Sequence, residues 1–332
     1  MKNANVAILG ATGAVGREMI KVLLERDFDP ARITCLASSR SAGKVIECAG
    51  HSFTVREATD EAFKGADIAL GAASNALAKQ FAPAIKAAGA VFIDNSSAFR
   101  MDADVPLVVP EINGADARAH KGIIANPNCS TIISLMALYP LARLSPIETL
   151  IASTYQAVSG AGAGGLAELE DQVQAYAAGG EMKINKFPHQ IAFNLIPQIG
   201  SALENGYTTE EMKMQNEGRK IMHLPKMNVT CTCVRVPVFR SHSISLTARF
   251  ARKISVEEAR AAISGAPGVA LADDVANGVY PMPLETSDQD TVFVGRIRED
   301  LTDERGLTLW CCGDQIRKGA ATNAVEIAEL LI

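Results

Sequence analysis

Val6-Ala7-Ile8-Leu9-Gly10-Ala11-Thr12-Gly13-Ala14-Val15-Gly16 joins a short apolar run to three glycines and the start of a helical segment. The apolar run is typical of a buried strand, and Ala14–Glu25 has the pattern of a helix. Glycines at a strand-to-helix turn let the backbone approach a pyrophosphate, whose charge the helix N-terminus stabilises. The spacing therefore predicts a dinucleotide site, with a glycine-rich turn that binds no ligand as the alternative.

The first 130 residues alternate short apolar runs with helical segments, as a parallel sheet covered on both faces does. We expect strands at Asn5–Leu9, Ile33–Ala37, Ile68–Ala72, Val91–Asp94, Leu107–Val109 and Ile123–Ala125, and helices at Ala14–Glu25 and Ala76–Ala88. The sequence therefore predicts an α/β fold that begins with a Rossmann-type, doubly wound parallel sheet.

After Pro146 the apolar runs lengthen and many alternate with polar residues, which is typical of an antiparallel sheet with one face in water. We expect strands at Ile147–Tyr155, Val229–Val236, Ser243–Phe250, Val292–Arg298 and Thr308–Cys312, with helices at Leu166–Ala177, Thr209–Met222 and Val256–Ser264. This pattern predicts a second, α+β domain whose sheet is largely antiparallel.

The last helix, expected at Gly319–Leu331, has a single apolar face and should pack on the first domain. We therefore assign residues 1–129 plus 315–332 to the dinucleotide-binding domain. Residues 130–314 then form the second domain.

Composition narrows the class of protein. The chain has 332 residues, 48% of them hydrophobic and 21% charged, which is typical of a soluble protein with two domains. A net charge of −5 without a Lys/Arg cluster argues against nucleic acid, and Val6–Leu9 is too short for a signal peptide or a membrane span. Seven cysteines, an odd number in apolar segments, favour free thiols in a reducing cytoplasm. Their spacing lacks the paired ligands of a zinc site, so we expect no metal.

Arg40 suggests which nicotinamide cofactor binds. An NAD enzyme places an acidic residue about 20 residues beyond the glycines, to bind the ribose hydroxyls. Here the second expected strand is followed by Ser38-Ser39-Arg40-Ser41. An arginine among hydroxyls suits a 2′-phosphate and favours NADP. An ordinary exposed loop arginine is the alternative.

Asn126-Pro127-Asn128-Cys129-Ser130-Thr131 contains a candidate nucleophile. Pro127 disfavours helix before it, and Asn128 or Ser130 can cap the apolar helix that follows. A thiol at a helix N-terminus loses its proton more easily, and the thiolate is the reactive form. Cys129 is therefore a candidate catalytic residue; a small buried apolar residue is the alternative.

Other residues suited to anions and proton transfer lie in separate segments. Arg100 follows a buried strand, so we expect it at the carboxyl edge of the sheet, where ligands bind. Gln156 ends the first strand of the second domain and can hold a carboxylate or carbonyl. Glu217 and Lys220 share a helix face at i and i+3, although a solvated ion pair is the common outcome.

His242 is the best candidate among the five histidines for general acid–base chemistry. Arg235 lies on the same strand-loop segment and could anchor a substrate beside it. A nucleophilic cysteine, a histidine, several cations and an NADP fold indicate one chemical class. In that class a thiolate attacks an acyl carbon, and hydride is exchanged at the level of the thioester.

The motifs resemble those of the aspartate-semialdehyde dehydrogenase family nearly from end to end. They are GATGAVG (10–16), SSRSAG (38–43), NSSAFR (95–100), NPNCST (126–131), YQAVSGAG (155–162), NEGRKI (216–221), RVPVFRSH (235–242) and GDQIRKGAATNAVEIAE (313–329). The resemblance implies reduction of L-aspartyl 4-phosphate to L-aspartate 4-semialdehyde with NADP, through a cysteine thioester. It further implies a cytoplasmic homodimer in lysine, methionine and threonine biosynthesis.

The resemblance also implies a role for each matching residue. Cys129 is the expected nucleophile, His242 the proton acceptor and donor, and Gln156 and Arg235 the residues that orient the substrate. Arg235 is expected on the α-carboxylate and Glu217 on the α-amino group. Arg100, Lys220 and Asn128 are expected to bind phosphate. The expected NADP contacts are Gly10, Thr12, Gly13, Ala14, Val15, Arg40, Ser41, Ser159, Gly160, Gln315 and Asn323. No role is assigned to Phe239 or Arg240.

Two alternatives remain open at this point. One is another acyl-phosphate reductase, such as the N-acetylglutamyl-phosphate enzyme, although Glu217 suits a free ammonium better than an acetamide. The other is a non-catalytic NADP-binding protein, against which the intact Cys129, Gln156 and His242 argue.

Overall fold

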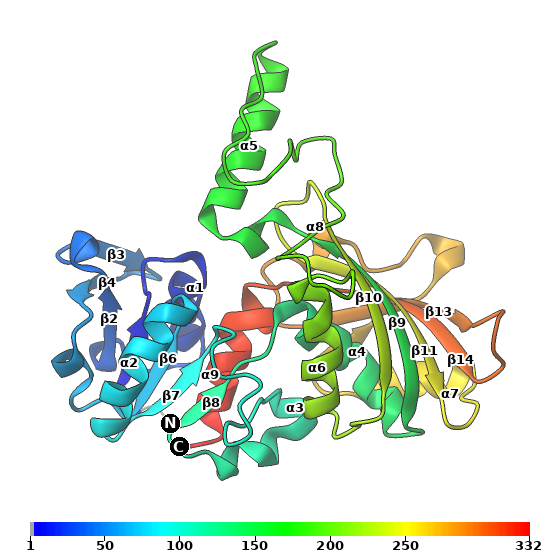
Figure 1. The fold of residues 1–332 in the computed structure, drawn as a ribbon, viewed down its shortest axis with the longest axis horizontal. Helices are drawn as coiled ribbons and strands as arrows, with labels where there is room; N and C mark the ends of the chain where they lie inside the picture. The colour runs from blue at the N-terminus through cyan, green and yellow to red at the C-terminus, as the bar shows by residue number, and fades with distance from the viewer. Residues whose placement is uncertain (1–2) are drawn as a thin grey trace. The chain divides into compact units, whose positions relative to one another are not determined.

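The computed structural model describes residues 3–332, which form two compact units. The first unit holds the chain up to Asn128 together with Ala320–Ile332, and the second holds Cys129–Gly319. In Figure 1 the sheet of the first unit is blue to cyan, and that of the second runs from green to orange. The domain limits expected from the sequence lie within a few residues of these and stay a prediction.

The first unit is built on a parallel sheet of six strands in the order β5-β2-β1-β6-β7-β8. These are β1 (Val6–Leu9), β2 (Ile33–Ala37), β5 (Arg56–Glu57), β6 (Ile68–Gly71), β7 (Val91–Asp94) and β8 (Ile123–Ala125), while β3 (Val45–Cys48) and β4 (His51–Thr54) form a separate hairpin. Its helices are α1 (Ala14–Glu25), α2 (Asn75–Ala87), α3 (Pro110–Asn113) and α9 (Thr322–Glu329).

Both faces of this sheet are buried, because alternate residues of β1 enter two different hydrophobic clusters. Val6 and Ile8 belong to a cluster that includes side chains of α1 and α9. Ala7 and Leu9 belong to another that includes side chains of α2. The Rossmann-type, doubly wound arrangement predicted from the sequence is confirmed.

Two expected elements of this unit differ from the structure. Leu107–Val109 forms a single bridge between Leu107 and Ala125 in place of a strand, because Pro110 starts helix α3 and the Val109 N–H donates to Asn113 Oδ1 at 2.9 Å. The last helix is shorter than predicted, since Arg317–Ala321 form a π-helical turn before α9 begins.

The second unit contains a mixed sheet of six strands in the order β10-β9-β11-β14-β13-β12. These are β9 (Ile147–Gln156), β10 (Asn228–Arg235), β11 (His242–Phe250), β12 (Val269–Leu271), β13 (Val292–Glu299) and β14 (Gly306–Gly313). The central pairings are antiparallel, as predicted, whereas β10 on β9 and β12 on β13 are parallel. The helices are α4 (Cys129–Ala142), α5 (Ala163–Ala177), α6 (Thr209–Ile221), α7 (Val256–Ser264) and α8 (Pro283–Thr286).

Helix α4 is apolar on almost every side, as a helix at the centre of a core must be. It contacts β9, β11, β13 and β14 as well as α6 and α7. Its first residue is therefore held by the core of the second unit.

Candidate active site

The register of the second sheet brings three of the predicted residues to one edge. Strands β9 and β10 run parallel with Gln156 opposite Arg235, so both strands end together. Strand β11 runs antiparallel to β9 and begins at His242, next to that end. Alternation along β9 and β10 buries Gln156 and Arg235 on the same side.

Cys129 is the first residue of α4, as its sequence context predicted. Its thiol is half-buried, and its Sγ lies 3.4 Å from His242 Nε2. Gly319 packs directly on it, because a Cβ at Gly319 would lie 2.9 Å from the Cβ of Cys129. Sequence reasoning missed Gly319, whose contact arises only in the folded chain.

A backbone group fixes the tautomer of His242. The N–H of Ala157, the residue after β9, donates to His242 Nδ1 at 3.0 Å. A ring nitrogen that accepts carries no proton, so the neutral ring carries its proton on Nε2, facing Cys129. Burial of the ring, reinforced by the charge of Arg235, lowers the pKa of His242 from 6.5 to about 3. His242 is therefore a neutral donor toward the sulfur at physiological pH.

Gln156 lies beside this pair. Its Nε2 is 3.5 Å from His242 Nε2, and the Thr154 hydroxyl donates to its Oε1 at 3.0 Å. Its Nε2 also donates to Glu210 Oε1 at 3.3 Å. Sequence reasoning missed Glu210, which stands on α6 seven residues before Glu217 and so on the same helix face.

Arg235 is 6% exposed, and its guanidinium donates to the Ala157 carbonyl at 2.6 Å. Burial lowers the pKa of the guanidinium, and negative charge at Cys129 and Glu210 opposes that effect. Gly160 lies against it, since an added Cβ would come within 2.8 Å of the Arg235 guanidinium and 3.3 Å of His242 Cε1. A cation is thus held beside the thiol and the imidazole.

Glu217 and Lys220 both lie on α6, as predicted, with Glu217 buried and Lys220 half-buried. Helix α6 packs on β10, the strand that carries Arg235, and on α4. The same helix therefore carries these two predicted residues and the Glu210 that contacts Gln156.

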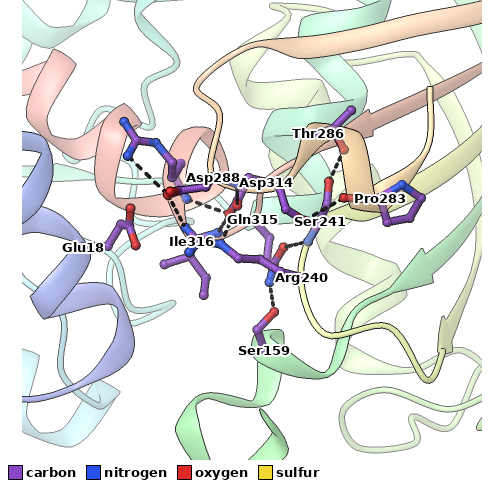
Figure 2. Close-up of polar contacts among 12 residues, drawn as sticks. Glu18, Ser159, Arg240, Ser241, Pro283, Thr286, Asp288, Asp314, Gln315 and Ile316 are labelled. Atoms are coloured by element: carbon purple, nitrogen blue, oxygen red, sulfur yellow. Dashed lines mark hydrogen bonds and ion pairs between the residues drawn. The ribbon is translucent and has the colours of Figure 1, made fainter.

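The turn before His242 is held by Gln315 (Figure 2). Ser241 adopts a φ of 73°, a left-handed conformation that is unusual for serine. Its N–H donates to Gln315 Oε1 at 2.8 Å, and its hydroxyl bonds that of Thr286 at 2.6 Å. Gln315 Nε2 donates to Ser159 Oγ, so both ends of this amide are engaged by protein groups. The NADP contacts expected for Ser159 and Gln315 stay predictions.

Arg240, for which the motifs imply no role, is paired with a buried carboxylate in the same region. Its Nε lies 2.5 Å from Asp314 Oδ2 (Figure 2), while Asp314 Oδ1 accepts from the N–H groups of Ile316 and Arg317. This pair ties the turn before His242 to the segment that precedes α9.

Arg100 and Asn128, two further predicted residues, belong to the first unit. Arg100 is buried and donates to the carbonyls of Asn126 at 2.9 Å and Asn95 at 2.7 Å. Asn126 lies in the segment that leads through the buried Asn128 to Cys129. Arg100 is thus anchored on the chain segment that immediately precedes the nucleophile.

A pocket in the first unit is lined by residues of the glycine turn and of the loop after β2. They are Gly10, Thr12, Gly13, Ser38, Ser39 and Arg40, with Glu57 from β5 and residues of α2 and the β6–α2 loop. Gly10 has a φ of 90°, and a Cβ there would lie 2.4 Å from the Ala72 carbonyl oxygen, so only glycine fits. Ala14 and Val15 begin α1, and Ser41 shares a short helical turn with Arg40. Sequence reasoning missed Glu57, because β5 lies beyond the loop that it searched for an acid.

Asn323 stands on α9, where its Nδ2 donates to Asn126 Oδ1 at 2.6 Å and to the Val108 carbonyl at 2.9 Å. Its Oδ1 and the Nδ2 of Asn95 are buried without a hydrogen-bond partner. Buried polar atoms are rarely left in this state unless a ligand or water completes them.

Within residues 3–332, no three His, Cys, Asp or Glu side chains gather in a way that could hold a metal ion. None of the helices in the described part of the chain has the length and apolarity that a membrane crossing requires.

Known proteins resemble this chain over both units. A family model for the NAD binding domain of semialdehyde dehydrogenases matches residues 5–120, and one for their dimerisation domain matches residues 138–318. The aspartate-semialdehyde dehydrogenase of Aquifex aeolicus is 53% identical to this chain, and the match covers 98% of this chain and 97% of the relative. That of Bacillus subtilis is 47% identical, and the match covers 99% of this chain and 98% of the relative. Aspartate semialdehyde dehydrogenase II of Vibrio cholerae, solved with ASA, has a TM-score of 0.95 at 43% identity and covers 99% of this chain and 98% of its own.

Proposed function

This chain belongs to the aspartate-semialdehyde dehydrogenase family, and on that premise we propose that Cys129 carries the acyl group of the reaction as a thioester. It is an NAD(P)-dependent, phosphorylating oxidoreductase of aspartate-derived amino-acid biosynthesis. The observation that supports the role of Cys129 best is its position as first residue of α4, with Sγ 3.4 Å from the proton-bearing Nε2 of His242. Production of NADPH from aspartate semialdehyde, NADP and inorganic phosphate tests the proposal.

In the biosynthetic direction the Cys129 thiolate attacks the acyl carbon of aspartyl phosphate, and the carbon–oxygen bond to phosphate breaks. NADPH, when bound, supplies the hydride that reduces the resulting thioester. The backbone N–H groups at the start of α4, with the Asn128 amide, stabilise the oxyanion by about 3 kcal/mol per donor. As the carbon–sulfur bond breaks, the sulfur leaves as a thiolate that accepts the hydrogen bond from His242 Nε2.

The two anionic groups of the substrate call for separate cations. We assign the α-carboxylate to Arg235, whose guanidinium is buried beside His242, and the α-ammonium to Glu217. Arg100 and Lys220, with Asn128, are assigned to phosphate. Gln156 orients the reacting carbonyl through its amide N–H.

Arg235→Lys should lower kcat/KM for aspartate semialdehyde by about 10- to 100-fold, although the charge is kept, because lysine lacks the planar fork that binds a carboxylate at two points. Arg100→Ala should instead raise the KM for phosphate more than the KM for the semialdehyde. Steady-state kinetics in the direction that consumes phosphate measure both constants. A rise confined to the semialdehyde KM in Arg100→Ala would show that the two assignments are exchanged.

The pocket of the first unit fits a dinucleotide. Gly10 leaves open a space that a Cβ would fill, and helix α1 begins four residues later with its N-terminal N–H groups. The unpaired Oδ1 of Asn323 and Nδ2 of Asn95 offer one acceptor and one donor, which together suit a carboxamide. We propose NADP as the cofactor, with Arg40 and Ser41 at the 2′-phosphate and Ser159, Gly160 and Gln315 as further contacts.

Arg40→Ala should weaken the binding of NADP by about 10- to 100-fold and the binding of NAD by much less, because only NADP carries the 2′-phosphate. Fluorescence titration of both cofactors measures the ratio. Lys44→Ala is the matched control, since it removes an exposed cation from the same loop but not from the pocket lining. Equal losses for the two cofactors would show that Arg40 does not bind the 2′-phosphate.

A homodimer is the expected assembly. The dimerisation-domain match covers most of the second unit, and α5 with the segment after it exposes Val173, Tyr176, Phe193 and Leu195 at 40% to 65%. In Figure 1 this helix extends away from the sheet of its own unit. Apolar side chains in such a position favour a partner surface. The seven free cysteines are compatible with the cytoplasmic location that we propose.

Reduction of N-acetylglutamyl phosphate is not favoured, because relatives that match 98% and 99% of this chain are named aspartate-semialdehyde dehydrogenases. The buried Glu217 carboxylate also suits an ammonium. Comparing NADPH production from aspartate semialdehyde and from N-acetylglutamate semialdehyde separates the two substrates. A non-catalytic NADP-binding protein would turn over neither.

A further inference from the structure

Asp314 follows directly on the strand that pairs with the start of β11. Strand β14 ends at Gly313, and Gly313 lies opposite His242 in the sheet. The Asp314 side chain is fully buried, and its Oδ1 accepts from the N–H groups of Ile316 at 2.8 Å and Arg317 at 3.1 Å. One oxygen of this carboxylate therefore fixes the start of the π-helical turn that leads to α9.

The other oxygen of the carboxylate holds the turn that leads into His242 (Figure 2). Asp314 Oδ2 accepts from the Asp288 N–H at 2.7 Å and lies 2.5 Å from Arg240 Nε. Arg240 stands two residues before His242, and Ser241 between them has a φ of 73°. A serine keeps such a backbone conformation only where the surrounding structure imposes it. The pairing of Arg240 with Asp314 is part of what imposes it.

The π-helical turn also reaches the nucleophile. The Gly319 N–H donates to the Asp314 carbonyl at 3.0 Å, which is the hydrogen bond over five residues that defines a π-helix. A Cβ on Gly319 would lie 2.9 Å from the Cβ of Cys129 and 3.4 Å from its Cα, so the backbone of the turn packs directly on Cys129. Such turns are rare and are found mostly at functional sites.

We propose that Asp314 is a positioning residue for the reaction. Its carboxylate holds the turn before His242, and its carbonyl holds Gly319 against Cys129. Together these contacts set the distance of 3.4 Å between Cys129 Sγ and His242 Nε2. This inference rests on the proposed function of that pair, and it assigns a role to a side chain that acts through its neighbours.

Gly319→Ala tests the contact with Cys129. Alanine suits the backbone there, because Gly319 lies in the π-helical turn without a left-handed φ, but the added methyl must displace Cys129. We expect kcat to fall by about 10- to 100-fold, because a small misplacement of a reacting group is costly. Gly114→Ala is the matched control, since Gly114 is also in helical backbone and its added methyl would meet only the flexible side chain of Leu330. Its kcat should stay within about twofold of wild type.

Asp314→Asn tests the carboxylate. Asparagine keeps the shape of the side chain, but its NH2 group only donates, and in either orientation it would face two nitrogen donors. We expect kcat to fall by about 10- to 100-fold here too. Asp290→Asn is the matched control, because it weakens the neighbouring ion pair with Arg317 at 2.8 Å and leaves the groups around Asp314 in place. Its kcat should stay within about threefold of wild type.

The pH dependence of Cys129 alkylation separates positioning from a purely structural role. The hydrogen bond from His242 stabilises the Cys129 thiolate, so weakening that bond should raise the pH of half-maximal alkylation by about one unit. Labelling with iodoacetamide, followed by mass spectrometry of the peptide that contains Cys129, measures this value without turnover. We expect the rise in Gly319→Ala and Asp314→Asn, and an unchanged value in the two controls.

A wild-type kcat in Gly319→Ala would overturn the proposal, even if Asp314→Asn were too unstable to assay. So would a loss of kcat in Asp314→Asn that follows a fall in Tm while the pH of half-maximal alkylation stays unchanged, because the role would then be structural. Wild-type turnover is measured first. A wild-type protein without turnover would refute the proposed function, whereas the alkylation of its variants would still test the positioning of Cys129 and His242.

Discussion

Cys129→Ser should lower kcat by a factor on the order of 10⁵ to 10⁶, because it removes the sulfur that we propose carries the acyl group. A serine hydroxyl at the start of α4 stays protonated near neutral pH, and the neutral His242 takes up no proton from it. NADPH should bind to the variant with unchanged affinity, because Cys129 does not line the pocket of the first unit. Turnover by absorbance and NADPH binding by fluorescence measure the two quantities.

Cys48→Ser is the matched control for that variant. Cys129 and Cys48 are the two half-buried thiols among the seven, and the remaining five are buried. Burial raises the pKa of Cys48, so its thiol is a poor nucleophile despite its access to solvent. Cys48→Ser should keep full activity. Residual turnover of Cys129→Ser within about tenfold of wild type would contradict the mechanism.

His242→Gln should keep at least about tenfold more activity than His242→Asn. Both variants should be slower than wild type by about 10²-fold or more, which is roughly the rate that a positioned proton donor contributes. The reason is geometric: the amide of glutamine reaches the position of Nε2, whereas that of asparagine reaches only that of Nδ1. A side chain that acts as a neutral donor to sulfur can be replaced in part by an amide N–H. Equal activities of the two variants would indicate that His242 must take up a proton.

The pKa of His242 gives a second check on its neutral state. Its value is about 3 in the folded protein, against 6.5 for an unperturbed histidine. Between those two values the unfolded chain binds a proton that the folded chain does not. The contribution of His242 to the free energy of unfolding therefore falls as the pH falls from 6.5 toward 3. Nitrogen NMR of the ring should show a neutral Nε2–H tautomer from pH 5 to pH 8, and a titration in that range would contradict it.

The sequence indicated the elements of the site better than the contacts within it. The glycine turn and the alternating apolar runs depend on local geometry, so the parallel sheet and the turn at Gly10 were predictable. Cys129 was recognisable because Pro127 and the apolar run after it mark a helix start. The order of strands in the second sheet, which brings His242 and Gln156 together, is not encoded in any local pattern.

What sequence reasoning missed depends on tertiary contacts. The Ala157 N–H that sets the His242 tautomer belongs to the backbone and leaves no side-chain signal. Glu210 was overlooked beside Glu217, although a seven-residue spacing on one helix was the available clue. Gly319 must be glycine because Cys129 packs on it, and the two are 190 positions apart in the chain. The strand expected at Leu107–Val109 was wrong because Pro110 and Asn113 start a helix there.

The formation of a thioester on Cys129 is the central claim, and omitting phosphate tests it most directly. Enzyme mixed with aspartate semialdehyde and NADP but no phosphate should release one burst of NADPH, at most one molecule per subunit, and then stop. Mass spectrometry of the acid-quenched protein should find the aspartyl group on the peptide that contains Cys129, and added phosphate should remove it. A burst without an adduct on that peptide, or an adduct on any other cysteine, would contradict the account.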